Sequence, residues 1–404
     1  MAGPSTSTAS VSFLRWREIP PGVWALGVVS LLMDLSSEMI HALLPLYLVG
    51  VLGASMLTVG VIEGIAEATA SIVRIFSGAL SDYLGRRKLL VALGYGMAAL
   101  TKPVFPLAST IGWLVAARFI DRVGKGIRGA PRDALVADLS PPELRGTSFG
   151  LRQSLDTTGA LLAPLLVIVL MLLLANDFTT VFWIAVVPAV LAFAVIVVAV
   201  KEPSRTPAAA RAARLPLRSS DLRRLDGAFW VAVVVAAVFT LARFSEAFLL
   251  LRAQSVGMPL ALTPAVMVVM NVVYALSAWP AGALSDSIGR YGLLAAGLAV
   301  LLLADLVLAL GSSVAAIGIG VALWGLHMGM TQGLLAALVA DKAPPDLRGT
   351  AFGAFHLVTG LAMLAASVIA GTLWDVAGPR GTFLAGAAFV AVSLASLPVV
   401  RRLT

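Results

Sequence analysis

The chain has 404 residues, of which 59% are hydrophobic and only 12% are charged, with a formal net charge of +8 at pH 7 and a mean hydropathy of +0.97. A soluble domain carries about 25% charged residues, so this composition excludes an ordinary soluble globular protein and predicts one embedded in a membrane. The chain has no cysteine, which excludes disulfides, thiolate metal sites and cysteine nucleophiles.

Long apolar runs recur from residue 24 almost to the end of the chain. A helix of about 20 residues crosses the roughly 30 Å of hydrocarbon in a bilayer. We therefore expect an all-α integral membrane fold with twelve transmembrane helices, at residues 24–50, 57–80, 88–108, 111–136, 146–174, 179–200, 227–252, 262–284, 290–311, 313–339, 350–374 and 380–400. The first run is too long for the core of a cleaved signal peptide, so we expect it to remain in the protein.

The chain contains two internal repeats. GALSDYLGRR at 78–87 matches GALSDSIGRY at 282–291, and ALVADLSPPELRGTSFG at 134–150 matches ALVADKAPPDLRGTAFG at 337–353. The copies lie 204 and 203 residues apart, which is half of the chain, and this spacing indicates duplication of one ancestral half. It predicts two pseudo-symmetric six-helix bundles at 24–200 and 227–400, joined by a linker at 201–226 and flanked by tails at 1–23 and 401–404.

Positive charge gathers on one side of the predicted helices. Loops on the opposite side, such as 50–56 and 109–110, carry almost none. By the positive-inside rule both termini and the linker are cytoplasmic, as expected for a multi-pass protein of the inner (cytoplasmic) membrane. The dispersal of positive charge over many short loops argues against nucleic-acid binding. Outside the linker, the basic side holds Arg15, Arg17, Arg86, Arg87, Lys88, Arg290, Lys342, Arg348, Arg401 and Arg402.

Together these features resemble the major facilitator superfamily of secondary transporters, and the resemblance covers nearly the whole chain. It rests on two sets of six spans, a long central linker, and the sequence G-x-L-S-D-x-x-G-R-R between the second and third spans, echoed between the eighth and ninth. The resemblance implies two bundles that rock around a central cavity and expose a midplane site to alternate sides. It also implies a monomer that moves small molecules, uses the proton gradient and needs no cofactor. The sequence has no nucleotide-binding loop or nucleophile motif, so we do not expect an enzyme.

The repeated loop has the chemistry of a conformational gate. Gly78 and Gly85 permit a close helix approach and a tight turn, and Asp82 supplies a carboxylate at the membrane edge. If the bundles meet as in the resembled family, Asp82 faces the start of helix 350–374 and Asp286 the start of helix 146–174, where a helix N-terminus favours an anion. The predicted gating residues are Gly78, Asp82, Gly85, Arg86, Arg128, Arg132, Gly282, Asp286 and Arg290.

Charged side chains inside the predicted helices mark a transport pathway, because each costs roughly 2.5–3.5 kcal/mol at a helix centre. Acidic residues form stripes on helices 24–50 and 57–80, and mainly basic residues form one on helix 111–136. This pattern predicts carboxylates that exchange protons as arginines approach and withdraw; a permanent ion-pair lattice is the alternative. The predicted proton-coupling residues are Asp34, Glu38, Glu63, Glu67 and Glu246.

The two predicted cavity walls differ in chemistry. By the repeat offset, Arg128 and Arg152 of the first half correspond to Thr331 and Phe355 of the second, so the C-terminal wall is mostly small, apolar or aromatic. A cavity with one charged wall and one mainly apolar wall suits an amphiphilic or weakly charged organic solute. The predicted substrate-cavity residues are His41, Arg118, Asp121, Arg122, Lys125, Arg152, Asp156, Arg243, Asn271, Tyr274, Trp324, His327, Gln332 and His356.

The direction of transport is suggested by helix 146–174. Its residues Gly159, Ala163 and Pro164 are similar to the G-x-x-x-G-P signature of drug:proton antiporters, with alanine in place of the second glycine. In that signature small residues allow close, bent packing against the opposite bundle. We therefore predict a proton-coupled exporter of small amphiphilic molecules or drugs.

Two alternatives remain open. The arginines of helices 111–136 and 146–174 suit carboxylates or phosphates, which favours an organic-anion transporter. The carboxylates together with His41, His327 and His356 suit a divalent-metal exporter, although the sequence shows no recognisable metal-ligand spacing and we expect no bound metal.

Overall fold

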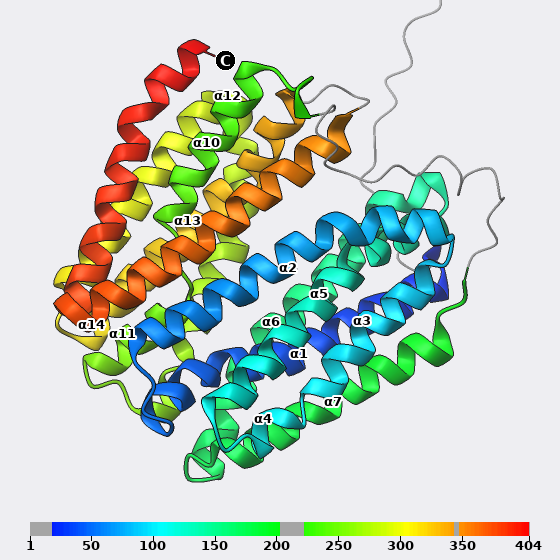
Figure 1. Ribbon diagram of the computed structural model, residues 1–404, viewed down its shortest axis with the longest axis horizontal. Coiled ribbons are helices and arrows are strands. Elements are labelled where there is room, and N and C mark those ends of the chain that lie inside the picture. The colour runs from blue at the N-terminus through cyan, green and yellow to red at the C-terminus, as the bar shows by residue number, and fades with distance from the viewer. Residues whose placement is uncertain (1–17, 203–221, 343–346, 404) are drawn as a thin grey trace, which may run out of the picture.

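The computed structural model describes residues 18–202, 222–342 and 347–403, and these ranges fold into helices joined by short turns (Figure 1). The predicted tail 1–23 and linker 201–226 lie largely outside the described residues. At Asp82, Gly282, Asp286, Arg290 and Gln332 only the helical backbone is described. The helices are α1 (Pro21–Gly50), α2 (Met56–Leu84), α3 (Arg87–Thr101), α4 (Val104–Leu107), α5 (Ile111–Leu139), α6 (Arg145–Leu173), α7 (Phe178–Ala199), α10 (Gly227–Leu241), α11 (Ala247–Ser255), α12 (Ala265–Leu310), α13 (Val314–Lys342) and α14 (Arg348–Leu403), with 3-10 turns at Pro142–Leu144 and Leu260–Leu262.

The twelve predicted spans are all present as helical segments. Two of them form α12, which bends at Gly289, and two form α14, which bends at Gly378. Nine helices within the described ranges are long and apolar enough to cross a membrane. α5 is not among them because it carries too many charges, and neither is the span of α10 and α11 because it is interrupted. The chain is an all-α membrane protein, as its sequence predicts.

Both copies of the repeated loop turn at a glycine with positive φ. Gly85 ends α2 in the left-handed conformation (φ +63°, ψ +13°), whereas Gly289 bends α12 in an extended conformation (φ +75°, ψ 159°); glycine adopts both without a side-chain clash. The turns predicted from the repeat are therefore present in both halves.

Two predicted helices are broken. Helix 88–108 divides into α3 and α4 at Lys102 and Pro103, because proline has no amide hydrogen to continue the helix. Helix 227–252 divides into α10 and α11. At this second break the amide of Ser245 donates to Ser367 Oγ of α14 (3.3 Å) and the amide of Ala247 donates to Ser245 Oγ (3.2 Å). Side-chain hydroxyls thus replace part of the lost helical bonding.

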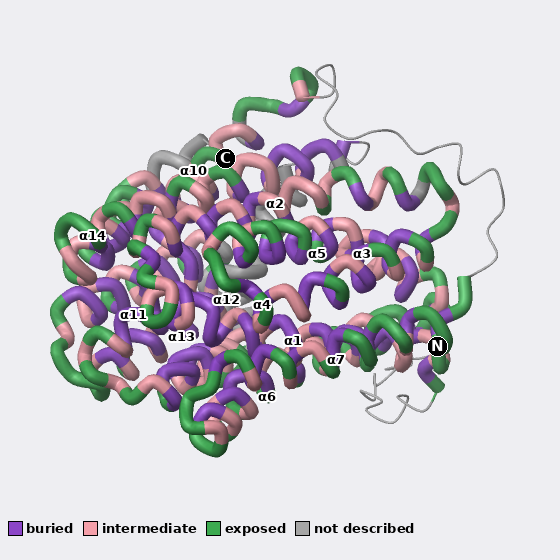
Figure 2. The backbone as a smooth tube through the Cα atoms, turned by 60° about the horizontal axis from the view of Figure 1, so that its bottom comes forward, coloured by how far each residue is buried: buried purple, intermediate pink, exposed green. Residues whose placement is uncertain are grey.

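The helices form two groups by their contacts. α1 to α7 pack on one another, as do α10 to α14, and the groups meet through α2 with α14, α6 with α12, and α1 with α11 (Figure 1). We call the end with the α2–α3 turn and residues 202 and 226 the linker end, and the end with loops 51–55, 174–177 and 256–264 the far end. Buried and exposed stretches alternate along the helices (Figure 2), and the exposed apolar side chains of α6 and α7, such as Leu173 and Val198, fit a lipid-facing surface.

The two bundles interlock toward the far end through glycines. A methyl group on Gly60 of α2 would overlap the carbonyl oxygen of Ser367 in α14, and one on Gly371 of α14 would overlap that of Met56 in α2. Small residues allow such close helix approach. Deeper along the same contact, a methyl group on Gly64 would lie 2.9 Å from Leu364 Cδ1.

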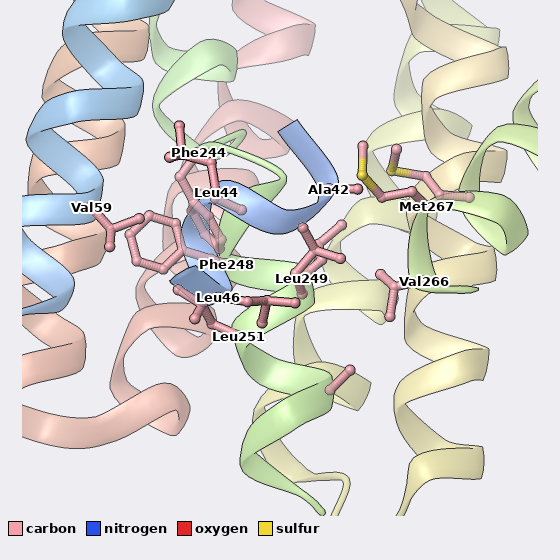
Figure 3. Close-up of a cluster of buried hydrophobic side chains, with 14 of the residues drawn as sticks. Ala42, Leu44, Leu46, Val59, Phe244, Phe248, Leu249, Leu251, Val266 and Met267 are labelled. Carbon is pink, nitrogen blue, oxygen red and sulfur yellow. The ribbon is translucent and has the colours of Figure 1, made fainter. Parts of the chain in front are cut away.

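An apolar cluster fills the rest of the far-end contact. Leu44 and Leu46 of α1 and Val59 of α2 lie against Phe244, which precedes α11, and Phe248 of α11 (Figure 3). The aromatic rings of Phe244 and Phe248 meet edge to face, with centroids 5.6 Å apart. This cluster joins both bundles and excludes water from the far end.

The linker end shows no such interlocking among the described residues. A methyl group on Gly146 or Gly150 of α6 would meet no described atom within 4 Å. The described parts of the two bundles therefore pack tightly at the far end, and none of them packs against Gly146 or Gly150 at the linker end.

One predicted packing contact is wrong. The sequence similarity to antiporters places Gly159 against the opposite bundle, yet a methyl group there would overlap the carbonyl oxygen of Leu31 in α1 of the same bundle. Ala163 and Pro164 are likewise buried. The physical reason is that α6 and α1 are the closely packed neighbours within the bundle, so the small residues of α6 serve that contact.

Candidate functional site

A cavity lies between the bundles and consists of three adjoining chambers of about 270, 310 and 270 Å³. Glu67 of α2 lines all three chambers. The first is walled by Glu38, His41, Glu63, Glu67, Arg122 and Lys125 of the N-terminal bundle and by Arg243, Glu246, Trp324 and Met363 of the C-terminal bundle. We call it the central chamber.

An ion-pair network crosses the N-terminal wall of the central chamber. Arg118 Nη2 of α5 donates to both oxygens of Glu63 in α2, at 2.9 and 3.1 Å. His41 of α1 lies with Nε2 3.4 Å from Glu63 Oε2 and Nδ1 3.3 Å from Glu38 Oε2. The acidic stripes of α1 and α2 therefore meet the basic stripe of α5, as their spacing predicts.

Glu67 is the member of this network that reaches furthest into the cavity. It accepts from Arg122 Nη1 at 3.1 Å, and its side chain is 40% exposed, whereas Arg122 is 3% exposed and Glu63 only 1%. Glu67 is therefore accessible to solvent at the cavity and held by a buried cation on its other side.

The N-terminal bundle also contains a buried ion pair that sequence reasoning missed. Lys102, at the break between α3 and α4, is 1% exposed and donates to Asp121 Oδ1 of α5 at 3.0 Å and to Ser37 Oγ of α1 at 3.1 Å. Asp121, predicted in the cavity, instead points to this lysine inside the bundle. The signal was a lone lysine within an otherwise apolar run.

Arg118 also lies away from the chambers. It forms the charged end of an apolar groove on the surface of α2 and α5, beside Val115 and Phe119. Its predicted role as a cavity residue is thus indirect, through Glu63.

The second chamber opens toward the linker end and holds more of the predicted residues. Asp34, Arg132 and Asp156 line it. Arg132 Nη1 lies 3.7 Å from Asp156 Oδ1, and its Nε lies 3.3 Å from Asp133 Oδ1. Arg152 of α6 is buried beside this chamber and lies 3.5 Å from Asp156 Oδ2.

The predicted gating residues of α5 are anchored within their own bundle. Arg128 stacks over the ring of Tyr95, 4.6 Å from its centroid, and Arg132 donates to Ser30 Oγ at 3.4 Å. The positions of the Asp82 and Asp286 carboxylates lie outside the described residues, so their predicted contacts with the opposite bundle stay predictions.

The C-terminal wall has few charges, as predicted. Arg243, Glu246 and Trp324 line the central chamber, and His356 lines the other two chambers. His327 does not line them: it is fully buried, with Nδ1 3.0 Å from the carbonyl oxygen of Gly297. Asn271 and Tyr274 of α12 are partly buried outside the three chambers.

Five charged groups of the cavity have no ion-pair partner within the described ranges: Asp34, Lys125, Arg128, Arg243 and Glu246. Lys125 is exposed and lines two chambers. Lys125 and Arg243 come from opposite bundles and line the same central chamber. The cavity therefore offers two cations that are free to receive an anionic group.

The histidines occupy three separate settings. His41 sits between Glu38 and Glu63, His327 bonds a carbonyl oxygen, and His356 stacks beside Phe352 with ring centroids 6.3 Å apart. No group of three or more histidines, aspartates and glutamates that could hold a metal ion occurs among the residues the structure describes.

At the far end the bundles are linked by a carboxylate. Asp375 of α14 accepts hydrogen bonds from the backbone amides of Met56 (3.0 Å) and Leu57 (2.9 Å), the first residues of α2. Amides of the first helical turn lack helical partners and carry partial positive charge. Asp375 therefore caps a helix of the opposite bundle, a contact that exists only while the far end is closed.

We expect Asp375→Asn to raise the ratio of far-end-open to far-end-closed molecules roughly fivefold, because asparagine keeps only one of the two accepting oxygens and has no negative charge at the first turn of α2, a loss of about 1 kcal/mol. Spin labels on cysteines introduced at Ser109 and Ser312, which are exposed at the far end of the two bundles, would report a larger population at long distance. The chain has no cysteine of its own to interfere.

Asp177→Asn provides the matched control for Asp375→Asn. Asp177 accepts from the amides of Thr179 (3.0 Å) and Thr180 (3.3 Å) and so caps α7 within one bundle. The hydroxyl of Thr180 lowers the pKa of Asp177, so this cap is present at neutral pH and weakens as the pH falls. An equal change of label distance in both variants would contradict a specific role for Asp375.

The structure has two six-helix groups that close at one end around a charged cavity, and one helix is broken beside that cavity. This arrangement defines a membrane transporter of the alternating-access class. The sequence profile of the Major Facilitator Superfamily matches residues 26–367. The chain belongs to this superfamily, whose members are secondary transporters, not enzymes, and need no cofactor.

Relatives and solved structures agree with this assignment. The chain is 34% identical over 385 residues, 93% of its own length and 94% of the relative's, to an uncharacterised MFS-type transporter of Methanocaldococcus jannaschii. It is 30% identical over 162 residues, 40% of the chain and 39% of the relative, to the multidrug resistance protein MdtH of Edwardsiella ictaluri. Its fold matches a variant of the nucleoside transporter NupG with a TM-score of 0.80 at 12% identity, over 94% of this chain and 99% of that one. It also matches the human organic anion transporter MFSD10 with a TM-score of 0.64 at 20% identity, over 94% of this chain and 100% of that one.

Proposed function

We propose that this transporter is a proton-coupled exporter of small amphiphilic organic molecules, working as a monomer in the inner membrane with the linker end in the cytoplasm. The observation that carries the proposal is Glu67, a carboxylate that is 40% exposed to the cavity and paired with the buried Arg122. Such a carboxylate can be reached by protons and also responds to movement of its partner.

Proton coupling follows from competition at Glu67. A proton bound there removes the negative charge that holds Arg122 (3.1 Å), and the freed guanidinium then attracts Glu63 or Glu38 instead. Conversely, closer approach of Arg122 favours the ionised carboxylate and releases the proton. The bundle can therefore adopt a different set of ion pairs in each protonation state, as proton antiport requires.

The C-terminal wall supports an amphiphilic substrate. Phe244, Trp324 and Met363 line the central chamber opposite the charged residues, and aromatic and thioether side chains accept varied apolar groups. Glu246 on the same wall suits a cationic group of the substrate. The partial similarity to MdtH, named as a multidrug resistance protein, is consistent with export of such molecules.

An organic anion is the second candidate substrate. Lys125 and Arg243 line the central chamber from opposite bundles without an ion-pair partner among the described residues, so one carboxylate or phosphate could bridge the two halves. The similarity in fold to a structure named as an organic anion transporter is compatible with this alternative.

Proton flux in liposomes separates these candidates. With an imposed pH gradient, we expect a cationic amphiphilic dye to trigger proton movement, and Glu67→Gln to reduce that movement more than tenfold. Glu143→Gln changes an exposed glutamate between α5 and α6 and should leave it unchanged. Flux triggered by an organic anion alone would favour the second candidate, and flux with neither, or equal flux in Glu67→Gln, would contradict the proposal.

A further inference from the structure

Asp305 is a buried acid that the central cavity does not use. It lies in the second half of α12, is 0% exposed, and neither carboxylate oxygen has a hydrogen-bond partner among the described residues. Gly386 of α14 leaves room for it: a methyl group there would lie 2.8 Å from Asp305 Oδ2. The site is thus shaped around the carboxyl group but supplies no donor to it.

None of the cations described on the neighbouring helices pairs with Asp305. On α13, His327 directs Nδ1 to the Gly297 carbonyl (3.0 Å). On α11, Arg252 donates to the Leu308 carbonyl (2.8 Å) and Ser255 Oγ (2.9 Å). On α14, Arg380 lies in an exposed position next to the bend at Gly378. Within the described ranges Asp305 has no ion pair, and an isolated ionised carboxylate is very unfavourable in apolar surroundings.

The internal repeat indicates where Asp305 lies relative to the cavity. In the first half, Gly94 of α3 closely approaches Gly124 and Arg128 of α5. In the second half, Gly297 of α12 makes the corresponding contacts with His327 and Thr331 of α13. All three positions are shifted by 203 residues, so the same offset relates these two helix pairs in three dimensions.

The same offset maps the pair of Lys102 and Asp121 onto Asp305 and Trp324. Lys102 and Asp121 are in direct contact at 3.0 Å, so by pseudo-symmetry Asp305 lies behind Trp324. Trp324 lines the central chamber, and its indole Nε1 is buried without a hydrogen-bond partner in the described part of the chain. The indole therefore separates a buried acid from the cavity.

We propose that Asp305 is a proton-binding site of the C-terminal bundle, neutral in this conformation and reached from the central chamber past Trp324. A proton from cavity water adds to the carboxylate and gives the carboxylic acid, with no other reactant. When Trp324 moves, water reaches the site and the proton can leave; the indole N–H is then the nearest donor for the carboxylate. The inference goes beyond the proposed function because Asp305 does not line the cavity.

Infrared spectroscopy of the purified protein in liposomes tests the site. At neutral pH we expect a carbonyl band of a protonated carboxylic acid that disappears in Asp305→Asn and remains in Asp177→Asn, which alters an exposed aspartate that caps α7 within one bundle. In the unaltered protein the same band should shift when the aspartates carry carboxyl-13C, which assigns the band to an aspartate even if Asp305→Asn does not fold. A band that Asp305→Asn leaves intact, or no such band at neutral pH, would overturn the proposal.

The path past Trp324 has its own test. After transfer to D2O the Asp305 band should shift slowly in the unaltered protein and at least tenfold faster in Trp324→Ala, whereas Trp324→Phe keeps a ring in place and should change the rate less. Equal exchange rates in all three would contradict the path. These bands report Asp305 whether or not Glu67 couples transport to protons, so failure of one proposal is distinguishable from failure of the other.

Discussion

Arg118→Leu should destabilise the N-terminal bundle by roughly 3–5 kcal/mol, the cost of removing one partner of a buried ion pair. Glu63 is 1% exposed and would lose both hydrogen bonds from the guanidinium, at 2.9 and 3.1 Å. Among the described residues, His41 at 3.4 Å would be its remaining ion-pair partner. Denaturant unfolding of the purified protein in detergent measures the loss.

The double variant Arg118→Leu with Glu63→Met tests the cause of this loss. Because no charge is then left buried, we expect it to recover most of the stability that Arg118→Leu loses. Arg74→Leu is the control: Arg74 is 50% exposed and pairs with Asp133 at 3.2 Å, so its loss should cost less than about 1 kcal/mol. If Arg118→Leu behaved like Arg74→Leu, the Arg118 pair would not stabilise the bundle.

Three features could be predicted because each follows from a pattern in the sequence. These are the helices, the internal repeat, and the contact between the acidic stripes of α1 and α2 and the basic stripe of α5. Glu63 and Glu67 are four residues apart, as are Arg118 and Arg122, so each pair shares a helix face. Once two such faces meet, the partners Glu63 with Arg118 and Glu67 with Arg122 follow in register.

The direction in which a single side chain points from its helix could not be predicted in this way. Asp121 follows Arg118 by three residues but bonds Lys102 behind the cavity, and one residue carries no periodic signal. Gly159 was assigned to the wrong neighbour because small residues permit close packing on either side. The far-end contact of Asp375 with the first amides of α2 joins residues more than 300 positions apart, and only the approach of the two bundles creates it.

Closure of the far end depends on Gly60. We expect Gly60→Val to shift the protein strongly toward a far-end-open state, because the added side chain overlaps the Ser367 carbonyl in α14 and a backbone atom cannot rotate away. Overpacking of this kind costs about 3 kcal/mol or more, which corresponds to roughly a hundredfold change in the ratio of the two states. Spin labels at Ser109 and Ser312 should then report mainly the longer distance.

The control for Gly60→Val is Gly318→Val in α13, where an added methyl group meets no described atom within 4 Å. The change from glycine to valine alters helix propensity by a similar amount at both sites, so a difference in label distance between the variants isolates the contact between bundles. If Gly60→Val kept the short far-end distance, α2 and α14 would have to separate without opening that end, and the interlocked glycines would not define the closed state. If the distance lengthened while proton flux continued, closure of the far end would not be required for transport, and the alternating-access cycle would have to be abandoned for this chain.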